Sequence, residues 1–192
     1  EPWSIYLHIP FCQKRCRFCA CNTIVSPKRD KVDGYLGELM LEIERVASCL
    51  PNRRRVAQLH LGGGTPTYFS APRTSDLLAH VRRYFVMTPD AEFSVELDPR
   101  VTTYEHIETL AHWGMNRISV GVQDTNLDVQ RAVNRVQPMH IVQRCVRRSR
   151  AAGVRSVNID LIYGLPGQTP DGFKETIQTV LNKLNPDRLA IY

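Results

Sequence analysis

Short apolar runs alternate with helix-like segments from one end of this chain to the other. Six of these runs are rich in β-forming residues and have the length of strands: Ser4–His8, Val56–Leu61, Glu92–Leu97, Asn116–Val120, Ser156–Ile162 and Arg188–Ile191. Helical patterns fill the five gaps between them. This alternation is typical of βα units around a parallel sheet. Because most of the runs are almost continuously apolar, we expect strands that are buried on both faces.

Six successive parallel strands joined by right-handed crossovers form either an open doubly wound sheet or part of a (βα)8 barrel. A complete barrel takes about 250 residues, whereas this chain has 192. No linker or low-complexity segment interrupts residues 1–192, so we expect one domain. The length favours an α/β fold in the form of a partial (βα)6 barrel, about three quarters of a TIM barrel.

The helical segments carry recognisable stripes and caps. In the first, about Val32–Cys49, apolar residues at helical spacing form one predicted buried stripe: Leu36, Leu39, Met40, Ile43, Val46 and Ala47. Thr102 followed by Glu105 predicts a capping box at the start of a later helix. Thr169 before Pro170 predicts an N-cap with proline at the first helical position.

Composition and charge exclude several classes of protein. With 43% hydrophobic and 23% charged residues, the chain has the makeup of a packed globular domain. Long apolar runs and a signal peptide are both missing, which predicts a soluble, cytoplasmic protein without a membrane partner. We also expect a monomer. The formal net charge of +6 predicts anionic partners. The basic runs at 53–55 and 144–150 are not interleaved with aromatic residues, so we expect no nucleic-acid partner.

Four of the six cysteines lie within ten residues of one another: Cys12, Cys16, Cys19 and Cys21. Such crowding favours metal ligation over disulfide pairing. The other two, Cys49 and Cys145, lie on predicted helices, where a buried, inert thiol is expected.

Cys12, Cys16 and Cys19 form a C-x3-C-x2-C pattern directly after the first strand, at the carboxyl end of the sheet, where such folds place their sites. Three thiolates can hold three irons of a four-iron cluster and leave the fourth iron open. A structural zinc site takes four ligands. With Cys21, four thiolates could close a zinc site or ligate a cluster fully, so the spacing leaves these alternatives open.

A glycine run, Gly62–Gly64, follows the second strand and leads into Thr65 and Pro66. Its bare backbone lets a ligand come close to N–H groups, although a simple tight turn has the same pattern. It is not a dinucleotide fingerprint, because Thr67 stands where the third glycine of G-x-G-x-x-G would fall.

Polar residues interrupt the apolar strands near their carboxyl ends. Glu96 and Asp98 lie two apart after the third strand, and Asn158 and Asp160 lie two apart on the fifth, so each pair shares a face. A solvated strand end or a salt bridge would explain them. Equally, carboxylates at this rim could bind an amino group or ribose hydroxyls.

The segment YLHIPFCQKRCRFCAC resembles the cluster loop of the radical S-adenosylmethionine enzymes, whose pattern is C-x3-C-x-aromatic-C, with Phe18 as the aromatic residue. Further segments narrow the resemblance to the oxygen-independent coproporphyrinogen III oxidases: CACNTIV, QLHLGGGTPTY, SVELDPR, SVGVQDTNLDVQRAVNR and NIDLIYGLPGQTPDGF. A related haem-chaperone branch usually lacks the cysteine that corresponds to Cys21, so its presence favours the oxidase family.

This resemblance implies a radical S-adenosylmethionine core that holds a [4Fe-4S] cluster on Cys12, Cys16 and Cys19. It implies that S-adenosylmethionine binds at the open iron and contacts Tyr6, Gly63 and Glu96. A second S-adenosylmethionine is implied at a further set of positions: Phe18, Gly64, Thr65, Gln123, Arg135 and Asp160. Cys21 is expected close to the reacting centre as a catalytic residue that does not bind iron.

The function implied is that of an oxidoreductase of haem biosynthesis. A 5′-deoxyadenosyl radical would remove a β-hydrogen from a propionate of coproporphyrinogen III, carbon dioxide would leave, and two such rounds would give protoporphyrinogen IX. The alternative is a haem chaperone that binds and transfers haem without decarboxylation. The electron donor and acceptor are not implied, and we expect the family's N-terminal extension and C-terminal domain to lie outside these residues.

Overall fold

The computed structural model describes residues 1–25, 27–50 and 54–192, so Arg53 of the predicted basic run lies outside the described residues. One six-stranded sheet has the order β1-β4-β5-β6-β7-β8, and every neighbouring pair in it is parallel. Its strands are β1 (Trp3–Ile9), β4 (Arg55–Gly63), β5 (Val86–Leu97), β6 (Arg117–Gln123), β7 (Ser156–Leu161) and β8 (Arg188–Ile191). The strands follow one another in space in the order of the chain, and all of these pairs are parallel. The predicted parallel α/β fold is therefore confirmed.

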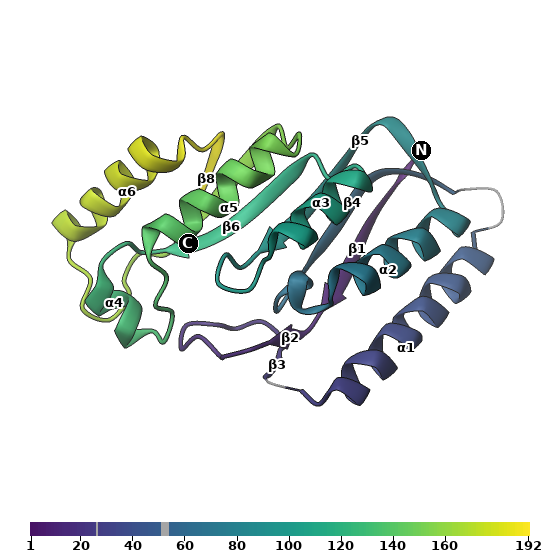
Figure 1. The fold of residues 1–192 in the computed structure, drawn as a ribbon, viewed down its shortest axis with the longest axis horizontal. Helices are drawn as coiled ribbons and strands as arrows, with labels where there is room; N and C mark the ends of the chain where they lie inside the picture. Colours follow the sequence, from purple (N-terminus) through teal and green to yellow (C-terminus); the bar gives the residue numbers. More distant parts are fainter. Residues whose placement is uncertain (26, 51–53) are drawn as a thin grey trace.

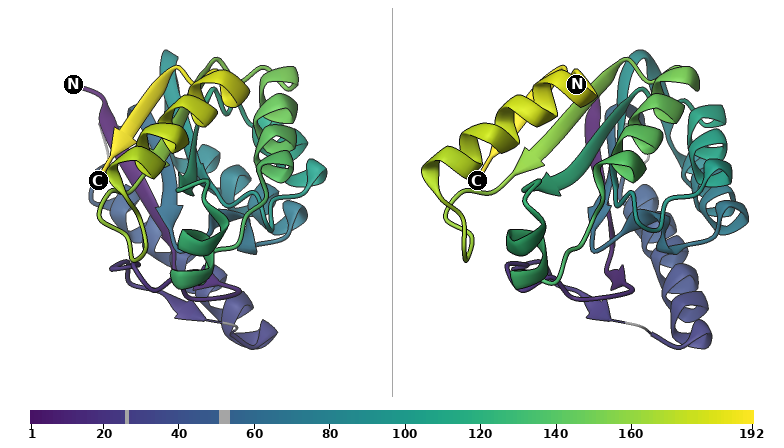
Figure 2. Two further views of the ribbon diagram at one scale, coloured as in Figure 1. Left: turned by 90° about the vertical axis from the view of Figure 1, so that its left-hand side faces the viewer. Right: turned by 60° about the vertical axis from the view of Figure 1, so that its left-hand side comes forward.

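One long helix lies in each of the five gaps between these strands, as predicted. They are α1 (Arg29–Ser48), α2 (Ala71–Tyr84), α3 (Tyr104–His112), α5 (Met139–Ala151) and α6 (Pro170–Leu184). Figure 1 shows them arranged along the sheet in chain order, and Figure 2 shows the twist of the strands beside them. None of the described helices combines the length and the apolar character needed to cross a membrane.

Successive side chains of a strand point alternately to an apolar face and to a polar face of the sheet. On β6, Ile118 and Val120 are buried and join one core with helix residues such as Leu110 and Val142. Ser119, between them, is only half-buried on the other face. The expectation of strands with two apolar faces is therefore wrong for β6, because its second face lines a polar cavity.

Strand β5 begins six residues before the predicted start at Glu92. It pairs with β4 in two stretches, Val56 with Met87 and Gln58 with Glu92, and the residues between Met87 and Glu92 form an irregularity in the ladder. Pro89 lies in this irregularity and has no N–H to donate. The irregular stretch hides the first part of the strand from a pattern-based prediction.

The capping box of α3 lies one residue later than predicted. The Thr103 hydroxyl accepts a hydrogen bond from the backbone N–H of His106 (3.3 Å), and the Thr103 N–H donates to His106 Nδ1 (3.1 Å). Thr102 cannot cap with Glu105, because its hydroxyl donates to the backbone oxygen of Asp98 (2.9 Å). The predicted cap residue thus holds the turn after β5.

Four shorter elements lie in the loops after the strands. They are β2 (Phe11–Cys12), β3 (Ile24–Val25), the 3-10 turn η1 (Pro66–Tyr68) and α4 (Leu127–Ala132). β2 and β3 pair in parallel, and the Ile24 N–H donates to the Pro10 carbonyl (2.7 Å). Elements this short have too few residues for a periodic pattern.

The N-cap of α6 is confirmed, because the Thr169 hydroxyl accepts a hydrogen bond from the Gly172 N–H (3.1 Å). We expect Thr169→Ala to lower the free energy of unfolding by about 1 kcal/mol, since one N–H at the helix start loses its acceptor. Urea unfolding measures the difference. Thr179→Ala, the same change inside α6, is the control and should have no comparable cost. Equal losses in the two variants would contradict the cap.

Candidate active site

The cysteine loop is held by protein contacts at both ends. The β2–β3 pair closes its base. On the far side it is bound to the end of α4: the Arg17 N–H donates to the Val133 carbonyl (3.0 Å), and the Arg17 side chain donates to the Ala132 carbonyl (2.9 Å). Asn134, whose backbone is left-handed (φ 58°), donates to the Arg15 carbonyl (2.9 Å). These contacts fix the loop beside the carboxyl ends of the strands.

A cavity of about 270 Å³ opens beneath this loop. Twelve of the thirteen predicted site residues line it: Cys12, Cys16, Phe18, Cys19, Cys21, Gly63, Gly64, Thr65, Glu96, Gln123, Arg135 and Asp160. They come from the cysteine loop, from four strands or the turns after them, and from the segment after α4. The fold therefore brings together residues that the sequence places far apart.

Tyr6, the thirteenth predicted residue, lies next to this cavity rather than in its lining. Its ring stacks on His60, with 5.5 Å between ring centroids. Gly62 separates Tyr6 from Glu96, because a Cβ atom at Gly62 would lie 2.9 Å from an atom of each. Burial first, and then the charges of Glu96 and Cys21, raise the pKa of Tyr6.

The glycine run permits close approach between chain segments. A Cβ atom at Gly64 would lie 2.9 Å from the Cys12 sulfur. The N–H of Gly64 donates to the Ile9 carbonyl (2.8 Å), and that of Gly63 donates to Glu96 Oε2 (3.1 Å). These two N–H groups already have partners within the protein. Because glycine has no side chain, the run leaves space beside the cysteines.

Two carboxylates from different strands face the cavity. Glu96 accepts from Gly63 and lies 3.3 Å from His60 Nε2. Asp160 accepts hydrogen bonds from Ser119 (2.8 Å) and Asn158 (2.7 Å). Burial raises the pKa of Asp160, although these two hydrogen bonds act in the opposite direction. The cavity thus holds acceptor groups that are fixed in position by their neighbours.

Arg100 is a site residue that the sequence reasoning did not identify. Its guanidinium binds Asp98 through Nε (2.9 Å to Oδ1) and Nη2 (2.6 Å to Oδ2), and Arg135 lies 3.6 Å from the same carboxylate. Burial acts to raise the pKa of Asp98, but the hydrogen bonds and charges of the two arginines outweigh it and lower the pKa. The sequence feature that could have pointed to Arg100 is its position two residues after Asp98 in the segment SVELDPR.

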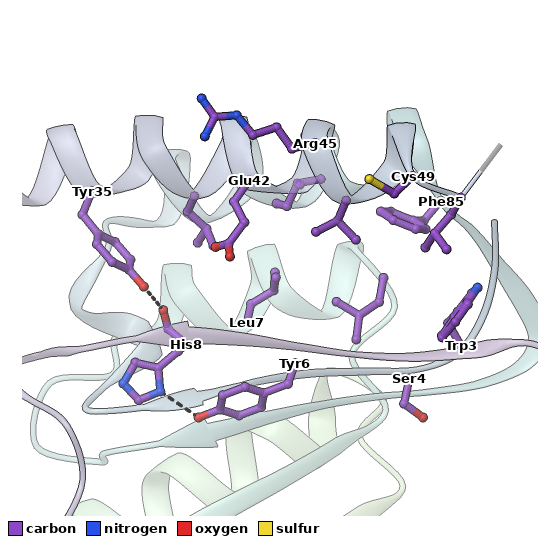
Figure 3. Close-up of a pocket in the computed structure, with 15 residues that line it drawn as sticks. Trp3, Ser4, Tyr6, Leu7, His8, Tyr35, Glu42, Arg45, Cys49 and Phe85 are labelled. Carbon is purple, nitrogen blue, oxygen red and sulfur yellow. Dashed lines mark hydrogen bonds between the residues drawn. The ribbon is translucent and has the colours of Figure 1, made fainter. Parts of the chain in front are cut away.

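A larger cavity, about 750 Å³, lies between α1 and β1 and is lined mostly by apolar side chains (Figure 3). Figure 3 shows Tyr35 donating to the His8 carbonyl across it. Two predictions fail here: Val46 is 47% exposed instead of lying in the buried stripe, and Cys49 is an exposed thiol. Because none of the four clustered cysteines lines this groove, the cysteine cavity is the better candidate site.

Comparison with known proteins identifies the family. The sequence model of the radical SAM superfamily (SAM, S-adenosylmethionine) matches residues 6–180. The chain belongs to the radical SAM superfamily. The matched segment includes the cysteine loop and the cavity-lining residues of β4, β5, β6 and β7.

Relatives with the same name as the family in the sequence resemblance match the chain over its full length. Oxygen-independent coproporphyrinogen III oxidases from Helicobacter pylori (strain J99) and Escherichia coli (strain K12) are 45% and 47% identical to the whole chain. The solved coproporphyrinogen III oxidase of Escherichia coli, described as a radical SAM enzyme, has a TM-score of 0.94 over 99% of this chain and 43% of its own. A radical SAM methyltransferase from Kitasatospora setae, 18% identical, shares the fold (TM-score 0.67; 99% of this chain, 36% of that one). The chain spans 42% of the length of the two oxidase relatives.

Radical SAM proteins hold a [4Fe-4S] cluster and SAM, and the residues that line the cavity have the chemistry to bind both. Gln123 Oε1 and Arg135 Nε are buried there without a hydrogen-bond partner among the described residues, which leaves an acceptor and a donor for a ligand. Across the described part of the chain, no three His, Cys, Asp or Glu side chains converge on one metal-ion position. A cluster takes its cysteines on separate irons, so it needs no such convergence.

The cavity shifts the pKa values of two of the clustered thiols upward. Burial raises the pKa of Cys12, and so do the charges of Cys19 and Cys16, while the Thr65 hydroxyl acts to lower it. Burial together with Cys19 and Glu96 raises the pKa of Cys21 to about 11. Thiolates that share a cavity repel one another, and a positively charged metal centre relieves this repulsion.

Asp98 is expected to stabilise the site at neutral pH. Asp98→Asn leaves two arginines without their counter-charge, and we expect the free energy of unfolding at pH 7 to fall by about 3 kcal/mol. A carboxyl whose native pKa is lowered contributes stability above its unfolded value of 3.8 and loses it as the pH falls through the native value. The gap between wild type and variant should therefore narrow below pH 3.8.

Urea unfolding at pH 7 and below the unfolded pKa of Asp98 measures this gap. Asp128→Asn is the control, because Asp128 forms an exposed ion pair on α4 (88% exposed). It should change stability by no more than about 0.5 kcal/mol. A gap for Asp98→Asn that persists unchanged in acid would contradict the ionised pairing.

Proposed function

We propose that this chain is the catalytic core of an oxygen-independent coproporphyrinogen III oxidase. In this reaction two propionate side chains each lose carbon dioxide and a β-hydrogen and become vinyl groups, giving protoporphyrinogen IX, while an acceptor takes the remaining electrons. The observation that carries the proposal is the single cavity lined by all four clustered cysteines and by Glu96. The 47% identity to the Escherichia coli oxidase structure supports the choice within the superfamily.

Cys12, Cys16 and Cys19 would bind three irons of the cluster and leave the fourth iron free. Glu96 would hold the amino group of SAM through a charge-assisted hydrogen bond, since Gly63 and His60 already fix its carboxylate. Tyr6, behind Gly62, would limit the movement of Glu96 on the other side. When bound, cluster and SAM supply a radical that removes a hydrogen atom from the substrate.

A second SAM is the finer part of this proposal, and it rests on the family resemblance. The residues assigned to it are Phe18, Gly64, Thr65, Gln123, Arg135 and Asp160, all of which line the same cavity. Two of the buried polar atoms that lack a hydrogen-bond partner among the described residues, Gln123 Oε1 and Arg135 Nε, belong to this set. Asp160 is held by Ser119 and Asn158 and would accept hydrogen bonds from ribose hydroxyls.

The substrate would be a tetrapyrrole with four carboxylates. Lys14 and Arg15, both exposed on the cysteine loop, line the cavity and would attract such an anion. The net charge of +6 acts in the same direction. Cys21 also lines the cavity, and it is the feature that favours the oxidase over the haem-chaperone branch.

Anaerobic incubation of the purified protein with reductant, SAM and coproporphyrinogen III tests the proposal. We expect protoporphyrinogen IX and release of carbon dioxide. Stoichiometric haem binding without turnover would identify a chaperone instead. Iron and sulfide analysis of the same preparation distinguishes both from a zinc-stabilised module.

We expect Cys12→Ala, Cys16→Ala and Cys19→Ala each to abolish the brown iron–sulfur cluster, because each removes the ligand of one iron. Cys145→Ala and Cys49→Ala are matched controls outside the cavity and should retain it. Iron, sulfide and visible absorbance of anaerobically purified protein give the result. Equal cluster content in all five variants would refute the ligand assignment.

Cys21→Ser should keep the iron and sulfide but reduce turnover by about tenfold or more, because it replaces a thiol that lies close to the reacting centre. Cys21 lines the cavity, and we expect that its sulfur does not bind an iron of the cluster. Loss of the cluster in this variant would make Cys21 a ligand. Unchanged turnover would remove it from the catalytic residues.

A further inference from the structure

Two guanidinium groups converge on the sulfur of one cysteine in the loop. Arg100 Nη2 lies 3.8 Å from the Cys16 sulfur, and Arg135 Nη1 lies 3.6 Å from it. Cys16 is also the most enclosed of the loop cysteines, with 7% of its surface exposed. Cys12, by contrast, has a neutral partner, the Thr65 hydroxyl at 3.6 Å. The sulfurs of the loop therefore differ in the charge beside them.

Asp98 fixes the direction of the Arg100 side chain. The carboxylate binds Nε and Nη2 of the guanidinium and also accepts from the Arg100 backbone N–H (3.0 Å). Nη2 carries two hydrogens, so one can point to Asp98 while the other points to Cys16. The side chains of Arg100 and Asp98 are 19% and 11% exposed. Water therefore has little access to this contact and screens it weakly.

We propose that Arg100, aligned by Asp98, is a positioning residue that donates a charge-assisted hydrogen bond to the Cys16 sulfur and raises the reduction potential of the cluster. This rests on the proposed function only in taking Cys16 as an iron ligand. Neither the position of Arg100 and Asp98 in the cavity nor the sequence pattern around them indicates this effect on the cluster.

The electrostatic reason is the charge of the cluster after reduction. An added electron makes a thiolate-bound cluster more negative, and hydrogen bonds to its sulfurs stabilise that state. A donor that carries a positive charge does so more strongly than a neutral one. Two arginines against one aspartate leave one net positive charge beside Cys16. Removing the Arg100 charge should therefore make the cluster harder to reduce.

Arg100 is a cleaner probe than Arg135. Arg135 also donates to the Gly121 carbonyl (2.8 Å) and is among the residues assigned to SAM, so its loss would change ligand binding as well. The informative variants are Arg100→Gln, which removes the charge, and Arg100→Lys, which keeps the charge but not the planar fork that reaches Asp98 and Cys16 together. Arg131→Gln is the control with the same charge change, since Arg131 is exposed on α4 and pairs with Asp128.

An EPR-monitored redox titration of anaerobically purified protein, without SAM or porphyrinogen, measures the midpoint potential. In Arg100→Gln we expect the ratio of reduced to oxidised cluster at a fixed potential to fall at least about tenfold, a shift of about 59 mV for one electron. Arg100→Lys should shift in the same direction by less, and Arg131→Gln should not shift.

An unchanged potential in Arg100→Gln with full iron and sulfide content would overturn the proposal. If Arg100→Gln does not retain the cluster, Arg100→Lys decides: a lower potential supports the proposal, and the wild-type value overturns it. The titration uses no substrate, so a shifted potential in a protein without oxidase activity would reject the proposed function while leaving this role of Arg100 intact.

Discussion

The site depends on the parallel pairing of six strands in chain order. Parallel pairing sends every carboxyl end to the same edge of the sheet, and right-handed crossovers place the helices on the face that the apolar residues cover. The residues that remain for the other face are polar: Ser119 on β6, Asp160 on β7 and Glu96 at the end of β5. Parallel pairing with right-handed crossovers thus places the apolar core on one face of the sheet and the polar cavity on the other.

Around this edge, neighbours fix each polar side chain in position. Asp160 is held by Ser119 and Asn158, Asp98 by Arg100, and Glu96 by Gly63. Buried acceptors with partners cost little, whereas unpaired ones are expensive. Among the described residues that line the cavity, Gln123 Oε1 and Arg135 Nε are buried without a hydrogen-bond partner, so both could bind a ligand.

Sequence reasoning found the six strands and the position of the cysteine loop because both follow from local patterns, whereas most of the cavity residues were assigned through the family resemblance. Apolar runs mark the strands, and the spacing of Cys12, Cys16 and Cys19 marks the loop. It placed the α3 cap at Thr102 instead of Thr103, because a tertiary contact with Asp98 engages the Thr102 hydroxyl. It missed Arg100 for a similar reason, since the contact with Cys16 joins residues 84 positions apart. The ligand roles themselves stay predictions from resemblance.

The β2–β3 pair and the contacts with α4 bear on how such a protein acquires its metal. In a zinc finger, metal binding and folding are a single event, and the free peptide has no fixed site. Here backbone hydrogen bonds close the cysteine loop at its base, and Arg17 and Asn134 tie its far side to α4. These contacts are made by backbone groups and by two side chains rather than by the cysteine sulfurs, so loop closure and metal ligation use different groups of the same loop.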